Sequence, residues 1–266
     1  MPTEVLVESV RERQRSVLWW TIGIAAAIAL NVAFYPSVQD DQALADYAKD
    51  LPESVRALFA GGELDITSPV GYLWSQVFAL MAPLLLLIFS IGAGAFAVAG
   101  EEERGTLDLL LAQPVRRRDY VLERFLALGT LVLQLTLVVL FTVAIGSALV
   151  DLEIGFDKLL AASASVGLLA LLFGTVALAV GSVRPGRVPA IAVASGLAVV
   201  SWLLDGLAQV VDALEPWRPL SPYYQALGHN PLREGVPLGG WAILIGLTAL
   251  FAVIAAAALE RRDLRQ

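Results

Sequence analysis

Six long apolar stretches constrain this sequence more than any other feature. Five of them hold no charged residue, and the remaining one contains a single acid, Asp205. A helix needs about 20 apolar residues to cross roughly 30 Å of hydrocarbon, because its backbone polar groups must be satisfied within the segment. We therefore predict an all-α integral membrane protein with six transmembrane helices, which span about residues 17–35, 70–99, 125–150, 159–183, 188–211 and 238–259.

The polar connections leave no room for a second domain. The longest are residues 36–69 and 212–237, and each is too short to bury an independent hydrophobic core. Residues 1–266 are thus predicted to form one transmembrane domain. In the 36–69 loop, apolar residues recur at helical spacing between residues 40 and 60, and Pro52 is suited to begin a second helix. We expect this outer amphipathic segment to cover the outer mouth of the bundle, with gating of that mouth as the alternative.

The basic residues are distributed asymmetrically between the two faces that these spans define. Of the 18 lysines and arginines, 13 fall on the face that carries both termini and the connection between residues 100 and 124. Because basic residues in short loops are retained in the cytoplasm, we predict a multi-pass protein of the cell membrane with both termini and this connection cytoplasmic.

The opposite face is rich in acids, and the net charge of the chain is -7. This excess indicates an organism from a high-salt environment, in which anionic surfaces stay hydrated. The alternative is that excluding basic residues from the outside simply leaves acids in excess.

The sequence lacks the residue patterns that common catalytic sites need. It has no cysteine and one histidine, His229, which argues against thiolate or histidine-rich metal sites and against a serine hydrolase. Neither Lys49 nor Lys158 follows the glycine that a phosphate-binding P-loop requires. We expect the chain to have no enzymatic activity by itself, to bind no cofactor and to have no nucleic-acid partner.

Three features inside the predicted spans bear on packing and transport. Asp205 lies near the outer end of the fifth span, where it is either solvated at the interface or part of a transport pathway. Pro83 is expected to kink the second span. In the fourth span, small residues recur at spacings of four and three, which allows close approach of helix backbones. We predict that this stripe packs within the chain rather than in a dimer: Ser163, Gly167, Ala170, Gly174, Ala177 and Gly181.

The connection between residues 100 and 124 is a compact charged hairpin. Glu101 to Glu103 precede a short helix that we expect to begin at Gly105-Thr106 and to end at Pro114, with the acids complementing its dipole. Asp119 is expected to cap the helix that leads into the third span.

The leucines of this hairpin are the residues that a solvated loop does not need. Leu107, Leu110 and Leu111 share one face of the short helix. The alternative is a loop whose arginines, Arg116 to Arg118, only set the membrane topology.

At these residues the chain resembles the permease subunits of ABC-2 type transporters. In that family the hairpin after the second span reads as an acid, Gly-Thr-Leu, a Leu-Leu pair, Pro-Val and an arginine. The matching residues here are Glu101 to Glu103, Gly105-Thr106-Leu107, Leu109 to Leu111, Pro114-Val115 and Arg116 to Arg118. The run from Thr67 to Leu73 is also similar to haloarchaeal members of the family, and the segment from Glu4 to Ser16 resembles its interfacial helix.

This resemblance implies that the hairpin docks on a separate cytoplasmic ATPase, which would hold ATP and magnesium. Two permeases, as two copies of one chain or as paralogues, would join two ATPases within the membrane lipid. Carried over residue by residue, the ATPase contact would consist of Glu101, Glu102, Glu103, Gly105, Thr106, Leu107, Leu110, Leu111 and Pro114.

The function that follows is that of the permease subunit of an ATP-driven exporter, with its cargo unassigned. Two alternatives remain open at this point. One is an ATP-independent secondary transporter, for which Asp205 would be the candidate ion-coupled residue. The other is a membrane accessory or scaffold subunit that binds an ATPase without moving any cargo.

Overall fold

The computed structural model describes residues 2–39, 50, 52–59, 67–105 and 117–261. The described residues form helices and no strands, and six helical segments are long and apolar enough to cross a membrane. The prediction of an all-α protein with six spanning helices is therefore confirmed. The first span is Ser16–Ser37, which begins within α1 (Pro2–Ala33). The others are the segment from Pro69 to Glu103, α8 (Arg117–Leu149), α9 (Phe156–Val183), α10 (Arg187–Leu207) and α13 (Leu238–Arg261).

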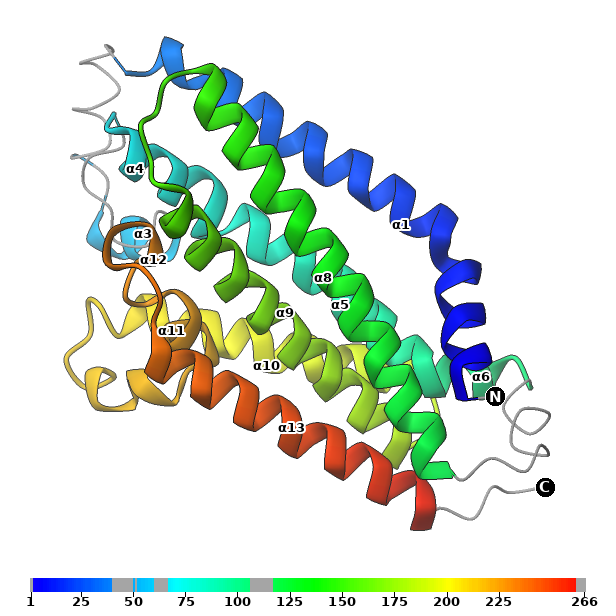
Figure 1. Cartoon of the computed structure of the whole chain (residues 1–266). Coiled ribbons are helices and arrows are strands. Elements are labelled where there is room, and N and C mark those ends of the chain that lie inside the picture. Colours follow the sequence, from blue (N-terminus) through cyan, green and yellow to red (C-terminus); the bar gives the residue numbers. More distant parts are fainter. Residues whose placement is uncertain (1, 40–49, 51, 60–66, 106–116, 262–266) are drawn as a thin grey trace.

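The long helices run side by side and define two ends of the bundle (Figure 1). One end carries the short helices α3 (Glu53–Phe59), α11 (Pro222–Leu227) and α12 (Pro231–Glu234), and we refer to it as the α11 end. The other carries α6 (Glu101–Glu103), the start of α1 and the last turn of α13, and we refer to it as the α6 end. Residues 4–16, which resembled a separate interfacial helix, are continuous with the first span in α1.

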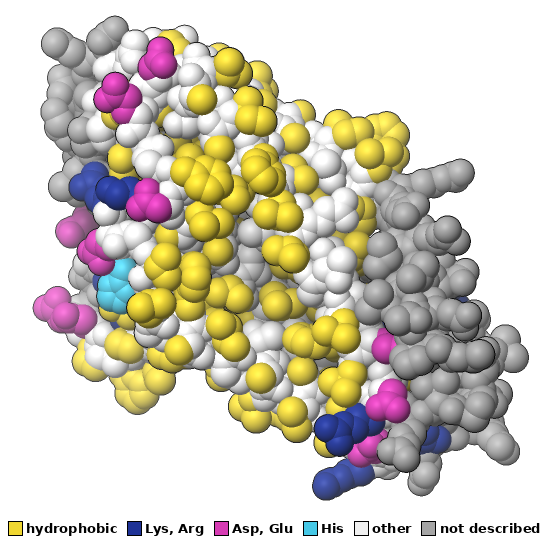
Figure 2. Space-filling model, in the orientation of Figure 1, with side chains coloured by type: hydrophobic (Ala, Val, Ile, Leu, Met, Phe, Trp, Pro, Cys, Tyr) yellow, Lys and Arg dark blue, Asp and Glu magenta, His cyan; other side chains and the backbone are white. Residues whose placement is uncertain are grey.

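The surface of the bundle is that of a protein surrounded by hydrocarbon. Figure 2 shows hydrophobic side chains across the middle of one face, with charged side chains near its two ends. Large apolar side chains such as Trp19 in α1, Leu149 in α8 and Val253 in α13 are more than half exposed. In water such exposure would drive aggregation, whereas in a bilayer it places apolar atoms against lipid tails.

Helix α9 is the centre of the bundle, because it packs against α5 (Met81–Ala95), α8, α10 and α13. Its small-residue stripe makes these contacts close. A Cβ atom on Gly174 would lie 2.1 Å from Ser90 Oγ, and one on Gly167 would lie 2.4 Å from Thr136 Oγ1. The Ser90 hydroxyl also donates a hydrogen bond of 2.6 Å to the Ala170 carbonyl. The prediction that this stripe packs within the chain is confirmed.

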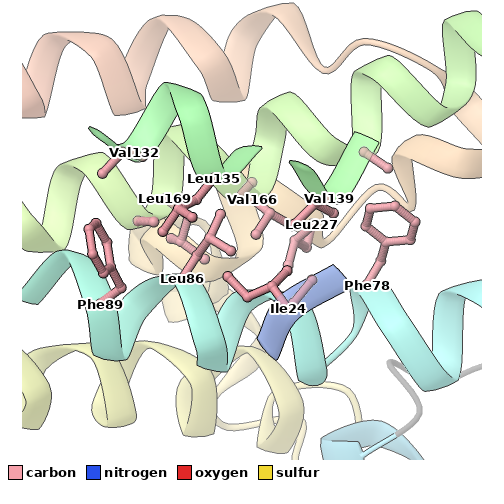
Figure 3. Close-up of a cluster of buried hydrophobic side chains, with 14 of the residues drawn as sticks. Ile24, Phe78, Leu86, Phe89, Val132, Leu135, Val139, Val166, Leu169 and Leu227 are labelled. Atoms are coloured by element: carbon pink, nitrogen blue, oxygen red, sulfur yellow. The ribbon is translucent and has the colours of Figure 1, made fainter. Parts of the chain in front are cut away.

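Larger apolar side chains fill the space on either side of this close contact. Figure 3 shows Leu86 and Phe89 of α5 against side chains of α8 and α9. Ile24 of α1, Phe78 of the π-helical turn η2 (Trp74–Phe78) and Leu227 of α11 complete the same cluster. Because Leu227 belongs to the connection between α10 and α13, part of that connection is core rather than surface.

The second span is broken where the sequence predicts a kink. Leu80 separates α4 (Pro69–Leu73) and η2 from α5, with a φ of -137° and a ψ of -51°. Proline has no N–H, so Pro83 leaves the carbonyl of Ala79 without its helical partner. The hydroxyl of Tyr223 in α11 donates to that carbonyl instead. Burial raises the pKa of the Tyr223 phenol, which keeps the donor proton in place.

The described part of the 36–69 connection includes α3, which lies at the α11 end. Helix α3 begins directly after Pro52 and packs on α10, where the Trp202 indole donates a hydrogen bond of 3.2 Å to the Leu58 carbonyl. A Cβ atom on Gly206 would lie 2.5 Å from the Leu58 side chain, so α3 sits directly on the α10 backbone. The first half of the predicted amphipathic pair lies outside the described residues.

The contact between α5 and α9 predicts a sharp difference between two glycines of one helix. A Cβ atom on Gly94 would lie 1.9 Å from the backbone oxygen of Gly174, whereas one on Gly92 meets no atom within 4 Å. Because a backbone cannot swing aside, we expect Gly94→Ala to separate the two helices at a cost of about 1–3 kcal/mol.

The measurement is the thermal unfolding midpoint of each variant in detergent, with Gly92→Ala as the matched control. Gly94→Ala should lower the midpoint and Gly92→Ala should leave it unchanged. Equal midpoints for the two variants would contradict the close packing of α5 on α9.

Candidate coupling site

The structure describes the two arms of the predicted hairpin, not its tip. Of the residues assigned to the ATPase contact, Glu101, Glu102, Glu103 and Gly105 are described. The remaining five lie outside the described residues: Thr106, Leu107, Leu110, Leu111 and Pro114. We use the term hairpin root for residues 96–105, which precede the tip in the chain, and residues 117–124, which follow it.

Gly105 follows the end of a helix, and the short helix expected to begin at Gly105-Thr106 lies outside the described residues. The second span continues through the π-helical turn η3 (Phe96–Gly100) into α6, and Gly105 follows with a φ of +69°. Its N–H donates to the Glu102 carbonyl at 2.9 Å. A left-handed glycine after the last helical residue is the usual way to stop a helix, because it has no Cβ to clash.

The glutamates therefore stand at the carboxyl end of the second span. The helix dipole is negative there, so carboxylates are disfavoured unless other groups compensate them. The structure provides such groups from two other spans. Glu101 is buried and forms an ion pair with Arg124 of α8, at 3.6 Å between Oε1 and Nη2.

Arg124 is held in place by the residues around it. Its guanidinium lies 5.0 Å from the ring centre of Tyr120, one helical turn earlier, and the Tyr120 hydroxyl donates to the Ala97 carbonyl at 3.3 Å. The ion pair, the stacked ring and the hydrogen bond together join the start of α8 to the end of the second span. The two arms of the hairpin are thus fixed to each other at the root.

Glu103 makes the second compensating contact, with the start of α10. Its Oε1 accepts a hydrogen bond of 2.7 Å from the backbone N–H of Arg187, the first residue of α10. The residue before it is Gly186, with a φ of +109°, and it has no side chain to cap the helix. The Glu103 carboxylate therefore serves as the cap from another span, an interaction typically worth about 1 kcal/mol.

An aromatic ring reinforces this contact. The guanidinium groups of Arg104 and Arg187 lie 4.5 Å and 5.8 Å from the ring centre of Phe96. Gly100 provides the room, since a Cβ atom there would lie 2.5 Å from that ring. Cations near an aromatic face are attracted to it, so Phe96 favours the approach of α10 to α6.

The start of α8 also reaches the sixth span. Arg117, the first residue of α8, donates to the carbonyl of Leu259 in the last turn of α13, at 3.5 Å. Asp119 is exposed in the first turn of α8 and is not at its cap position, which corrects the expected capping role. The hairpin root therefore contacts the ends of α10 and α13 as well as carrying the second and third spans.

Asp205, the possible pathway residue, lies at the α11 end and is not brought near the hairpin. It is buried, which corrects the expectation of a solvated side chain at the interface. Its Oδ1 accepts a hydrogen bond of 2.8 Å from Arg218 Nε in the 3₁₀ turn η4 (Glu215–Leu220), and the pair lines a cavity of about 40 Å³. Arg218 also lies 4.8 Å from the ring centre of Tyr224.

The described part of the chain offers no metal site. No group of three or more histidine, cysteine or carboxylate side chains in it is placed to hold a metal ion.

Comparison with known proteins agrees with this membrane architecture. The model of the family described as ABC-2 family transporter protein matches residues 8–264, which is nearly the whole chain. No curated protein matches the sequence.

The buried ion pair at the root predicts a non-additive pair of substitutions. Glu101→Gln or Arg124→Met alone leaves one buried charge without its partner, and we expect each to cost about 3 kcal/mol. Replacing both removes the stranded charge, so the double variant should lose less than the sum of the two. Thermal unfolding of all four forms in detergent measures this coupling, and strictly additive losses would contradict the ion pair.

Proposed function

The chain belongs to the ABC-2 transporter family and is a transmembrane subunit of an ABC transporter. We propose that it is the permease of an ATP-driven exporter and that its 100–124 hairpin couples it to a separate ATPase. The family implies association with an ABC ATPase, and the chain is not itself the catalytic subunit. The proposal adds three points: the hairpin is the docking element, the ATPase binds ATP and magnesium, and cargo leaves at the α11 end.

The observation that carries this proposal is the set of contacts made by the hairpin root. Its two arms are joined by the Glu101–Arg124 ion pair, and it reaches α10 through Glu103 and α13 through Arg117. A force applied to the hairpin tip is therefore delivered to four of the six spans. A loop that served only to set topology would need none of these contacts.

The other connection at the α6 end is a poor alternative for docking. Only Arg184, Pro185 and Gly186 separate α9 from α10. The hairpin is longer and carries the leucines, which favours it as the main contact with the ATPase. We propose that Glu101 to Glu103 hold the hairpin root together and that Leu107, Leu110 and Leu111 contact the ATPase.

In the mechanism we propose, ATP binding draws two ATPase subunits together and the docked hairpins move with them. The bias toward the releasing state comes from contacts that differ between the two states. Two permeases, as identical copies or as paralogues, face each other in the lipid of the cell membrane, with both termini on the cytoplasmic side. The acidic surface at the α11 end fits a high-salt exterior.

The two alternative functions receive less support. A secondary transporter needs a carboxylate that is free to change partners, and Asp205 is held by Arg218 of the same chain. A scaffold subunit would not need a root that connects the docking element to several spans. Cargo flux in vesicles distinguishes a transporter from a scaffold.

The docking proposal is tested with a pair of substitutions in the hairpin. Leu107→Asp should abolish recovery of a P-loop ATPase with the tagged chain and abolish stimulated ATP turnover, because it places a charge in an apolar contact. Leu109→Asp is the matched control, since the spacing predicts that Leu109 is off the face that Leu107, Leu110 and Leu111 would share in a helix.

The measurement is a mild-detergent purification followed by mass spectrometry of the bound proteins. Recovery of the ATPase with the parent chain and the control, and its loss with Leu107→Asp, is the expected result. Equal recovery with all three forms would place the contact elsewhere on the protein.

A further inference from the structure

Helix α10 packs on α9 and α5, with Ala190, Ala194 and Ala198 buried in the main core, and it makes polar contacts at both of its ends. A third of its membrane segment is buried inside the protein, the same share as in α13 and less than the more than three quarters of α9. Its exposed side chains include Val188, Val193 and Val200. Packed helices are able to slide past one another by small amounts as rigid units, so α10 is able to shift as a unit.

At the α6 end, α10 is joined to the second span by Glu103. The chain between α9 and α10 is not helical there, because Arg184 is extended and Gly186 has a φ of +109°. The contacts that continue from α10 into the hairpin root are the Glu103 hydrogen bond to the Arg187 N–H and the position of Arg187 near Phe96.

At the α11 end, α10 contacts α3, η4 and α11. Ser221, at the start of α11, donates to the Ser201 carbonyl at 2.7 Å, and Ser201 Oγ accepts from the Tyr223 N–H at 2.9 Å. Asp205 pairs with Arg218 of η4. Trp202 donates to Leu58 of α3.

We propose that Glu103 is a positioning residue that transmits movement of the hairpin to α10, and through α10 to α3, η4 and α11. This inference rests on the proposed function and identifies the path by which docking opens the far end. The 21 residues of α10 form a rod of about 30 Å, which carries a displacement at Arg187 to Ser201 and Asp205. Contact between the hairpin and α9 is not required for this path.

The test uses spin labels on α10 and α13 in the complex with the co-purifying ATPase. The chain has no cysteine, so Val193→Cys and Val253→Cys provide the only labelling sites, and both positions are exposed. Labelled chain is diluted with unlabelled chain so that distances within one copy dominate. The distance distribution is measured without nucleotide and with ATP and vanadate.

We expect the distance to shift on trapping in the parent chain and the shift to be lost in Glu103→Ala, with ATPase binding retained. Glu103→Gln should keep the shift, since its amide oxygen still accepts the Arg187 N–H. Asp119→Ala, which removes an exposed acid at the same end, is the matched control and should also keep it. Arg187→Pro removes the donor from the other side, at a helix position that tolerates proline, and should also lose the shift.

The outcomes separate the inference from the function on which it rests. A full shift in both Glu103→Ala and Arg187→Pro would overturn the role of Glu103 and leave hairpin docking intact. No shift in the parent chain with its ATPase bound and trapped would overturn both.

Discussion

Carboxylates at the carboxyl end of a long helix oppose the negative end of its dipole, and the organisation of the α6 end depends on how this opposition is relieved. Glu101 is offset by Arg124 of α8, and Glu103 by the amino end of α10. Each compensating group belongs to a different span. The glutamates, which are unfavourable at the end of their own helix, thus form contacts with α8 and α10. The hairpin projects from the point where these helices meet.

The close contact of α5 with α9 gives the bundle a fixed centre around which other parts can move. Lipid tails offer no hydrophobic drive for helix association, so contact depends on small residues and on hydrogen bonds such as that from Ser90 to Ala170. At Gly94 and Gly174 the two backbones are too close for a side chain. Helix α10 also packs on α9, and its two ends are joined to the hairpin root and to the short elements at the α11 end, so it connects the two ends of the bundle.

The sequence was sufficient for features that depend on local composition and period. Long uncharged stretches predict the six spans, the spacing of Gly167, Gly174 and Gly181 predicts the packing face of α9, and Pro83 predicts the break in the second span. The sequence was not sufficient where the environment of a side chain depends on a residue distant in the chain. Asp205 is buried because Arg218 folds back on it, and Tyr223 enters the core because Ala79 lacks a helical partner.

The root of the hairpin shows the same limit. From the sequence, Gly105 next to Thr106 is expected to start a helix, and the continuation of the second span through α6 as far as Glu103 is not foreseen. Glu103 accepts from a backbone N–H, which every residue except proline has, so the sequence does not indicate which residue is the partner. Phe96 and Arg187 were not selected from the sequence, because an aromatic residue and an arginine at the end of a span are common.

The most direct test of the central claim is photo-crosslinking of the hairpin in native membranes. Because the chain has no cysteine, a single cysteine at position 107 can carry a photoreactive group of short reach. The account predicts a covalent product with a P-loop ATPase, formed from position 107 and not from a cysteine placed at the exposed position 149 on the far end of α8. A product with lipid or with a second copy alone, in membranes where the ATPase is bound, would contradict it.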